Sequence, residues 1–151
     1  AEGHEWTTKY AHVKYGRTWC PTCATGRSQR RIRAIFETIF KGHHFPTCRP
    51  TFLRHGSQRH CLELDGYCSA LDLAFEYNGQ QHYEPDHFFN SFVDGRFAKQ
   101  RLHDEWKLLR CMSVGVRLVV VPHTVEDPWS FIRLCLLQWF PVAMLFPMAI
   151  T

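Results

Sequence analysis

The sequence predicts an α/β domain in which helices flank a mixed β-sheet, with a short Cys-containing unit ahead of it. Residues 70–77 alternate apolar and other side chains with the period of two that a β-strand shows, and residues 116–122 form the continuous β-branched run typical of a buried strand. Residues 28–41 and 96–111 repeat apolar side chains at helical spacing. Strands, helix and strand in this order indicate a mixed sheet with a crossover helix.

The composition agrees with a globular domain that has a sizeable core. The 151 residues are 45% hydrophobic, and the formal net charge of +4 permits a nucleic-acid partner without requiring one. The N-terminus is polar, so we expect no signal peptide, an intracellular protein and reduced thiols among the seven cysteines. Residues 129–151 are apolar but contain Arg133, Pro141 and Pro147, so we expect no membrane span.

The first part of the chain contains a cysteine pair with the spacing of a zinc knuckle. Cys20 and Cys23 are separated by Pro-Thr, and two thiolates on such a tight turn can occupy two corners of a tetrahedral zinc site. An unpaired or redox-active pair is the alternative. We therefore expect a structural zinc knuckle over residues 1–27 and a separate α/β domain over residues 28–151.

The same N-terminal region is strongly basic. Residues 1–33 hold seven Lys and Arg residues against two Glu. A local excess of positive charge suits contacts with DNA phosphates, and the candidate residues are Arg27, Arg30 and Arg31. A merely solvated basic face is the alternative interpretation.

A helix is predicted over residues 28–41, with Ser28 as its N-cap and Gly42 just past its end. Five apolar side chains recur on one of its faces: Ile32, Ile35, Phe36, Ile39 and Phe40. Residues 42–60 show no period and contain two Pro, so they should form a connecting loop. Glu37 is the only acid on the helix, and it either serves a site or pairs with a neighbouring cation.

Residues 61–65 and 70–77 are predicted to form two strands joined by a turn at Gly66 and Ser69. In the second strand one face carries Leu71, Leu73 and Phe75, and the other carries Ala70, Asp72, Ala74 and Glu76. Asp65 closes the first strand, so its carboxylate and that of Glu76 can converge at one edge of the hairpin. Such a pair suits a hard divalent cation such as Mg²⁺ or Mn²⁺. An ordinary hairpin with solvated acids is the alternative.

The residues after the hairpin add further polar candidates. His82 closely follows the second strand, and an imidazole with an ordinary pKa of about 6.5 suits a general base. In the helix over residues 96–111, Gln100, Asp104 and Lys107 share one stripe, where Asp104 can serve a site or form a surface salt bridge. The apolar contacts of this helix are expected from Phe97, Leu102, Trp106, Leu109 and Met112.

The C-terminal third should supply a central strand and a covering helix. Residues 116–122 are predicted to be the central strand. Asp127 and Pro128 form a cap and a first-turn Pro ahead of a helix at residues 129–138, which should cover the sheet. Residues 139–151 are apolar and irregular, so we expect them to pair at a sheet edge or to bury against a partner subunit in a homodimer.

Asp65, followed by Glu76-x-Asn78-Gly79-x-x-His82, resembles the core motif of the restriction-endonuclease-like, PD-(D/E)XK, superfamily, nearest its very-short-patch-repair-like branch. The resemblance covers residues 28–122. It implies a restriction-endonuclease-like mixed sheet flanked by helices, in which Asp65 and Glu76 hold the catalytic metal. The chain departs from the family pattern at Asn78, where Asp or Lys is commoner.

The resemblance also implies roles for side chains outside the motif core. Members of the branch place a Glu on the first helix and an Asp on the helix after the hairpin near the metal, and the matching residues here are Glu37 and Asp104. Asn78 and His82 complete the implied catalytic set.

A second resemblance concerns the N-terminal knuckle. Gly3-His4-Glu5-Trp6 is similar to the end of the Cys-x-x-Gly-His-x-Trp knuckle of zinc ribbons that are attached to endonuclease-like proteins, which makes His4 a third zinc ligand. The fourth ligand is then a Cys directly before Ala1, or else Cys48 or His43.

The leading hypothesis from the sequence is a divalent-metal-dependent DNA endonuclease with an N-terminal zinc knuckle that aids DNA binding. A second hypothesis is a zinc-dependent nucleic-acid-binding module whose nuclease-like core no longer cuts, which the departure at Asn78 keeps open. A third is a structural assembly factor that uses the apolar C-terminal tail.

Overall fold

The computed structural model describes residues 26–56, 60–79, 83 and 96–146. At its centre lies a three-stranded mixed sheet with the strand order β1-β2-β3. Its strands are β1 (Gly66–Cys68), β2 (Leu73–Asn78) and β3 (Arg117–Pro122). β1 runs antiparallel to β2, whereas β2 and β3 are parallel. A mixed α/β fold is therefore confirmed.

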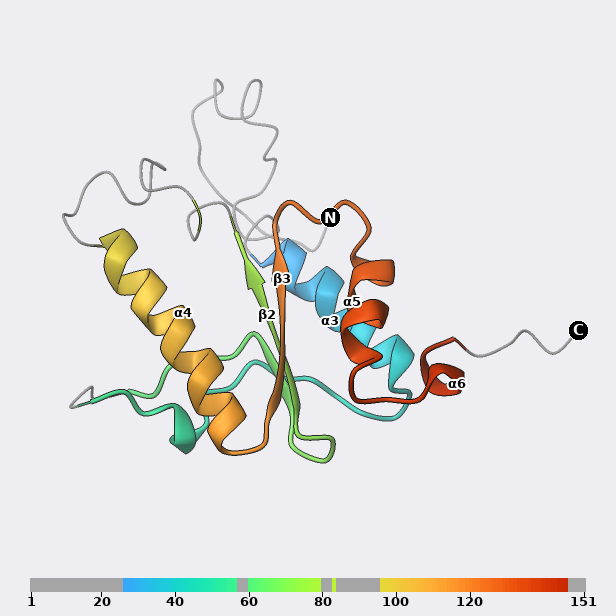
Figure 1. The fold of residues 1–151 in the computed structure, drawn as a ribbon, viewed down its shortest axis with the longest axis horizontal. Helices are drawn as coiled ribbons and strands as arrows, with labels where there is room; N and C mark the ends of the chain where they lie inside the picture. Colours follow the sequence, from blue (N-terminus) through green and yellow to red (C-terminus); the bar gives the residue numbers. More distant parts are fainter. Residues whose placement is uncertain (1–25, 57–59, 80–82, 84–95, 147–151) are drawn as a thin grey trace, which may run out of the picture.

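Helices cover both faces of this sheet. Figure 1 shows α4 (Arg96–Ser113) on one side of the strands, and α3 (Arg27–Ile39) and α5 (Pro128–Leu136) on the other. α4 connects the parallel strands β2 and β3, as the predicted crossover helix should. The sequence-based expectation of a sheet between helices is therefore correct.

α3 differs from its prediction at the N-terminus. The helix begins at Arg27, and its N-cap is Gly26 in the left-handed conformation with a φ of 68°. Ser28 lies inside the first turn, so the prediction of Ser28 as N-cap was wrong. The apolar face is confirmed, because Ile32, Ile35 and Phe36 are buried.

The hairpin is shifted along the chain relative to its prediction. Gly66 belongs to β1, and the turn is formed by residues 69–72, where Asp72 has a positive φ of 46°. The prediction of a turn at Gly66 was wrong because this glycine has a packing role. A Cβ built on Gly66 would overlap the ring of Phe75, its partner in β2.

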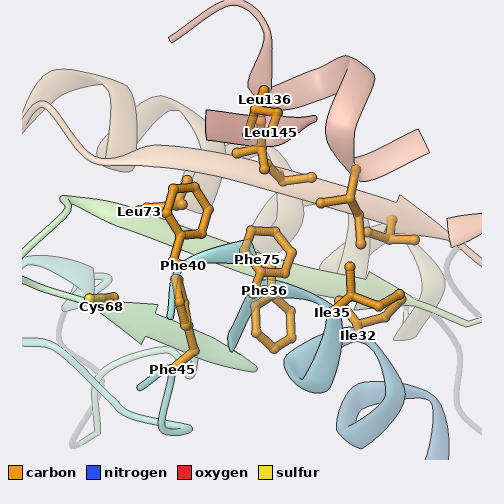
Figure 2. Packing of buried hydrophobic residues seen from close by; sticks show 13 residues of the cluster. Ile32, Ile35, Phe36, Phe40, Phe45, Cys68, Leu73, Phe75, Leu136 and Leu145 are labelled. Atoms are coloured by element: carbon orange, nitrogen blue, oxygen red, sulfur yellow. The ribbon is translucent and has the colours of Figure 1, made fainter. Parts of the chain in front are cut away.

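Two hydrophobic cores lie on the two faces of the sheet. The larger core contains Phe36 of α3 stacked on Phe75 of β2, with ring centroids 4.9 Å apart. Figure 2 shows these rings beside Phe40 and Phe45. The smaller core includes Ala74 of β2 and is completed by Leu53, Leu64, Cys111 and Val116. β2 is therefore buried on both of its faces, with the predicted alternation of Phe75 and Ala74.

α4 packs with a different side from the one predicted. Leu102, Leu109 and Met112 are 62%, 65% and 67% exposed, so their predicted core contacts were wrong. The predicted contact of Trp106 is confirmed, because it packs against the smaller core, in which Cys111 is buried. On a helical wheel, Cys111 and Lys107 share a side that lies opposite Leu102 and Leu109. The polar stripe of α4 therefore faces the sheet, and Leu102, Leu109 and Met112 face away from it.

β3 occupies the end of the sheet in the part of the chain that the structure describes. Its prediction as a central strand was therefore wrong for these residues, although Val119 and Val121 are buried in the larger core. The β-branched residues of β3 reflect burial of the faces of the strand, on which α4 and α5 pack, and not a central position in the sheet.

The C-terminal helix agrees closely with its prediction. The Asp127 side chain caps α5 by accepting from the backbone N–H groups of Trp129 and Ser130, and Ile132 and Leu136 are buried. A short helix α6 (Val142–Leu145) follows within the tail predicted to be irregular, and its Leu145 reaches the larger core. No helix among the described residues is both long and apolar enough to cross a membrane.

Candidate metal centre

The hairpin register brings the two predicted carboxylates together. Gly66 pairs with Phe75, so one further step along the antiparallel ladder sets Asp65 opposite Glu76. Both residues are buried, with exposed fractions of 8% and 7%. The convergence of these two acids, predicted from their spacing in the sequence, is present in the fold.

A cleft of about 320 Å³ opens beside this pair. It lies between the start of α3, the strand β2 and one side of α4, and the loop before β1 forms its rim. Its lining residues are mostly polar: Gln29, Arg49, Leu62, Glu63, Asp65, Glu76, Tyr77, Gln100, His103 and Lys107.

Asp65 is held by one hydrogen bond to each carboxylate oxygen. The backbone N–H of Tyr77 donates to Oδ2 at 2.8 Å, and Nε2 of Gln29 donates to Oδ1 at 2.8 Å. Burial raises the pKa of the Asp65 carboxyl, although the Tyr77 N–H and the nearby Lys107 ammonium oppose this. The carboxylate is thus fixed in one orientation while it still faces the cleft.

Arg33 secures the backbone on which Asp65 sits. Its Nη2 donates to the backbone oxygen of Asp65 at 2.6 Å and to Oγ1 of Thr47 at 2.6 Å, while Nε donates to the backbone oxygen of Phe45 at 2.8 Å. α3 therefore holds the backbone directly before β1 with Arg33 and the Asp65 carboxylate with Gln29.

Glu76 has fewer hydrogen-bond partners than Asp65 among the described residues. Its Oε2 accepts from Lys107 Nζ at 2.8 Å, whereas its Oε1 is buried without a hydrogen-bond partner. Burial raises the pKa of Glu76 to about 7, and the Asp65 carboxylate adds to this, against the opposing effect of Lys107. Glu76 therefore carries an oxygen that the described residues leave unsatisfied.

Lys107 belongs to the site, although the sequence motif does not contain it. Its side chain is 11% exposed, and Nζ also donates to the backbone oxygen of Glu63 at 3.0 Å. The signal in the sequence was the polar stripe that Lys107 shares with Gln100 and Asp104. A buried salt bridge to a residue 31 positions earlier could not be recognised from that stripe.

Asn78 and Asp104 lie beside Glu76. They line a small cavity of about 10 Å³ together with Glu76 and Lys107. Oδ1 of Asp104 accepts from Gln100 Nε2 at 2.9 Å, and the Asp104 carboxylate contributes to the raised pKa of Glu76. The structure therefore brings both of these sequence-predicted site residues to the carboxylate pair.

Glu37 does not reach this centre. Its Oε1 accepts from the backbone N–H of Phe45 at 3.0 Å and lies 3.6 Å from Nδ1 of His44. It follows Gln29 by eight residues, which is about 12 Å along a helix. The site role expected for Glu37 is therefore corrected: Gln29, which sequence reasoning missed, is the α3 side chain that contacts Asp65.

Several predicted site residues lie outside the described residues, namely His82 and the zinc-knuckle ligands His4, Cys20 and Cys23. Arg27, Arg30 and Arg31 are described, and they are exposed on the first turns of α3. Of the two alternative zinc ligands, Nδ1 of His43 lies 3.8 Å from Cys68 Sγ, and Cys48 is a free cysteine.

Among the described residues, no group of three or more His, Cys, Asp and Glu side chains is arranged to hold a metal ion. The carboxylate pair therefore offers two protein ligands rather than a complete cage. Mg²⁺ is usually bound in this way, by one or two carboxylates together with water and substrate phosphates.

Comparison with known proteins finds three viral relatives. The chain is 35% identical over 112 residues to uncharacterized protein 033L of Invertebrate iridescent virus 3, which covers 72% of this chain and 57% of that protein. It is 39% identical over 72 residues to uncharacterized protein 094L of Frog virus 3 (isolate Goorha), with 48% and 46% covered. It is 36% identical over 88 residues to uncharacterized protein 307L of Invertebrate iridescent virus 6, with 55% and 44% covered.

The aligned segments thus span about half the length of these relatives. No protein-family model matches the chain, and no solved structure matches it.

Proposed function

We propose that this protein is a divalent-metal-dependent endonuclease that hydrolyses phosphodiester bonds in DNA, built on a restriction-endonuclease-like fold. The observation that supports this most strongly is the pairing of Asp65 and Glu76 at one wall of the cleft. Two buried carboxylates held side by side repel each other unless a cation joins them. A cation held there would also stabilise negative charge on a phosphodiester substrate.

The donors at the pair fit a hard divalent cation. Oε1 of Glu76 is buried and accepts no hydrogen bond in the described structure, so a cation would satisfy it. The remaining positions around Mg²⁺ or Mn²⁺ would be taken by water and by the substrate, since these ions use few protein ligands. Asp65 and Glu76 would hold the metal, with Asn78 and Asp104 beside it.

The reaction needs little more from the protein than position and charge. Water adds to phosphorus and one P–O ester bond breaks, which leaves a phosphate monoester and a free hydroxyl. A bound divalent cation lowers the pKa of its water and stabilises the charge on the phosphate. Gln29 and the Tyr77 N–H keep Asp65 oriented during this step, and Arg33 keeps the Asp65 backbone in place.

Cationic side chains near the cleft support a nucleic-acid substrate. Arg49 lines the rim, where it pairs with Glu63 at 3.0 Å in a half-exposed salt bridge. Arg27, Arg30 and Arg31 extend positive charge along α3. A zinc knuckle at residues 1–27 and a general base at His82 remain parts of the proposal that lie outside the described residues.

A homodimer, which the sequence suggested through residues 139–151, also remains part of the proposal, and α4 offers a second surface for it. The apolar stripe of α4 formed by Leu102, Leu109 and Met112 is exposed, and exposed apolar stripes of this kind are common at subunit contacts. Sedimentation velocity of wild type and Leu109→Glu tests it, because only a dimer through this stripe would dissociate in the variant.

One observation favours a second candidate function. Lys107 already neutralises Glu76, and Asn78 stands where the family motif has Asp or Lys. A nuclease-like fold in which a lysine of the same chain neutralises the carboxylate would bind nucleic acid without holding the metal ion that cutting needs.

Plasmid cleavage separates the two functions. Supercoiled DNA is incubated with wild type and with Asp65→Asn, in Mg²⁺ or Mn²⁺, with and without EDTA. The endonuclease predicts metal-dependent nicking by wild type alone and equal DNA binding by both proteins. If wild type binds DNA but cuts it with neither ion, the non-cutting binding module is the function that remains.

A further inference from the structure

Lys107 has two partners that differ in kind. Glu76 Oε2, at 2.8 Å, belongs to a carboxylate that faces the cleft, whereas the backbone oxygen of Glu63, at 3.0 Å, belongs to the loop before β1. An ammonium has three N–H groups, so these two acceptors leave one N–H for a further partner. The side chain lines the cleft and is almost fully buried.

The first of these partners belongs to the carboxylate that a metal ion would bind, through the Oε1 that has no hydrogen-bond partner among the described residues. A divalent cation on Glu76 and Asp65 would lie next to the Lys107 ammonium, and the two positive charges would repel each other strongly in a buried site. The second partner is neutral and lies outside the carboxylate pair. A metal ion would therefore release Lys107 from Glu76 but leave its anchor at Glu63 in place.

We propose that Lys107 is a displaceable counter-ion, which neutralises Glu76 in the metal-free protein and turns to the substrate phosphate once a divalent cation binds. This role rests on the proposed endonuclease function. The long flexible stem of Lys allows the ammonium to move while its backbone anchor is kept. Lys107 forms no covalent bond and transfers no proton in this role; it donates a hydrogen bond to a non-bridging oxygen of the phosphodiester.

A static salt bridge that holds α4 against β2 is the competing explanation. The two explanations differ in metal affinity. If Lys107 occupies the place of the cation, its removal should tighten metal binding, because a repelling charge is gone. If Lys107 only holds the helix, its removal should loosen the carboxylates and weaken metal binding.

Lys107→Met tests this, with Lys99→Met as the matched control, because Lys99 is an exposed lysine on the same helix. Mn²⁺ affinity is measured by electron paramagnetic resonance, DNA binding by anisotropy in Ca²⁺, and nicking in Mg²⁺. Lys107→Met should bind Mn²⁺ about tenfold more tightly and nick DNA at least about a hundredfold more slowly. DNA binding should persist, and Lys99→Met should match wild type.

The other outcomes are equally informative. Unchanged or weaker Mn²⁺ binding by Lys107→Met would overturn the counter-ion role, and unchanged nicking would overturn the phosphate role. If Lys107→Met does not fold, Lys107→Arg serves instead. A guanidinium can donate two N–H groups to one carboxylate and would be harder to displace, so the Lys107→Arg protein should bind Mn²⁺ more weakly than wild type. Wild type that neither binds Mn²⁺ nor cuts would remove the proposed function itself, and the counter-ion role with it.

Discussion

Gln29 Nε2 donates to Oδ1 of Asp65 at 2.8 Å, and this bond joins the first turn of α3 to the residue directly before β1 across 36 positions of sequence. The α3 side chain that contacts the carboxylate pair is therefore the amide of Gln29, near the beginning of the helix, and not Glu37 near the end of the helix. The contact orients Asp65 without adding a third negative charge to the cleft. Outer partners of this kind commonly change metal affinity or activity by about 10–100-fold when they are removed.

Gln29→Ala should therefore lower nicking about tenfold, with little loss of stability because Gln29 is only half-buried. Glu37→Gln is the control, since it removes the charge of the acid that the resemblance placed at the site but keeps an acceptor for the Phe45 N–H. It should cleave like wild type. Both are measured as nicking rates per folded molecule, and loss of cleavage in folded Glu37→Gln would show that the acid on the first helix does act at the site.

The Gly66 position predicts a stability effect. An added Cβ would overlap the Phe75 ring, which is stacked on Phe36 in the larger core. Gly66→Ala should therefore reduce the free energy of unfolding by about 2 kcal/mol or more. Gly42→Ala is the comparison, because Gly42 has a φ of 83° but open space around it, so only backbone strain of about 1 kcal/mol applies. If urea unfolding shows a larger loss of stability for Gly42→Ala than for Gly66→Ala, this packing role is refuted.

The raised pKa of Glu76 predicts a pH dependence of stability in the metal-free protein. Burial raises the pKa of its carboxyl from the ordinary 4.5 to about 7 in the folded state. Between these values the folded protein holds a proton that the unfolded chain releases, so stability falls as pH rises through this window. The full shift corresponds to about 3 kcal/mol.

Thermal or urea unfolding in EDTA between pH 4.5 and 8 tests that shift. Glu76→Gln should lose less stability than wild type over this range, whereas Glu105→Gln, an exposed acid on α4, should follow wild type. Parallel curves for wild type and Glu76→Gln would mean that Glu76 titrates at its ordinary pKa and that burial does not perturb it.

The exposed arginines of α3 predict the salt dependence of DNA binding. Replacing Arg27, Arg30 and Arg31 together by Ala should reduce the slope of log affinity against log salt by about three units at most, if each contacts one phosphate. Arg101→Ala on α4 is the control, because Arg101 is exposed and pairs with Glu105. Equal slopes for the triple variant and wild type would assign the three arginines to a solvated face.

The residues that sequence reasoning placed correctly are those with local periodicity or a short separation. The alternation of Phe75 and Ala74 in β2 is local, as is the cap formed by Asp127. The convergence of Asp65 and Glu76 needed a hairpin between them with its turn at residues 69–72. With the predicted turn at Gly66 and Ser69, Asp65 would have been next to the turn and away from Glu76, so the observed position of the turn is what sets the two residues opposite each other.

The failures arose where tertiary contacts decided between local alternatives. α4 has an apolar stripe at Leu102 and Leu109, and a second stripe that carries Lys107 and Cys111. Local hydrophobicity favoured the first stripe for burial. The structure buries the second, which places Cys111 in the smaller core and the Lys107 ammonium on the Glu76 carboxylate of β2. That partner is 31 residues away, so no helical period could have identified it.

The most direct measurement of the central claim is Mg²⁺-dependent nicking by Glu76→Gln, made together with melting and DNA binding on the same preparation. The amide keeps the shape of the side chain and an acceptor for Lys107, but it removes the charge that a divalent cation needs. We predict a folded protein that binds DNA like wild type and nicks it at least about a hundredfold more slowly. A folded Glu76→Gln protein that nicks DNA at the wild-type rate would contradict the assignment of the Asp65–Glu76 pair as a metal centre.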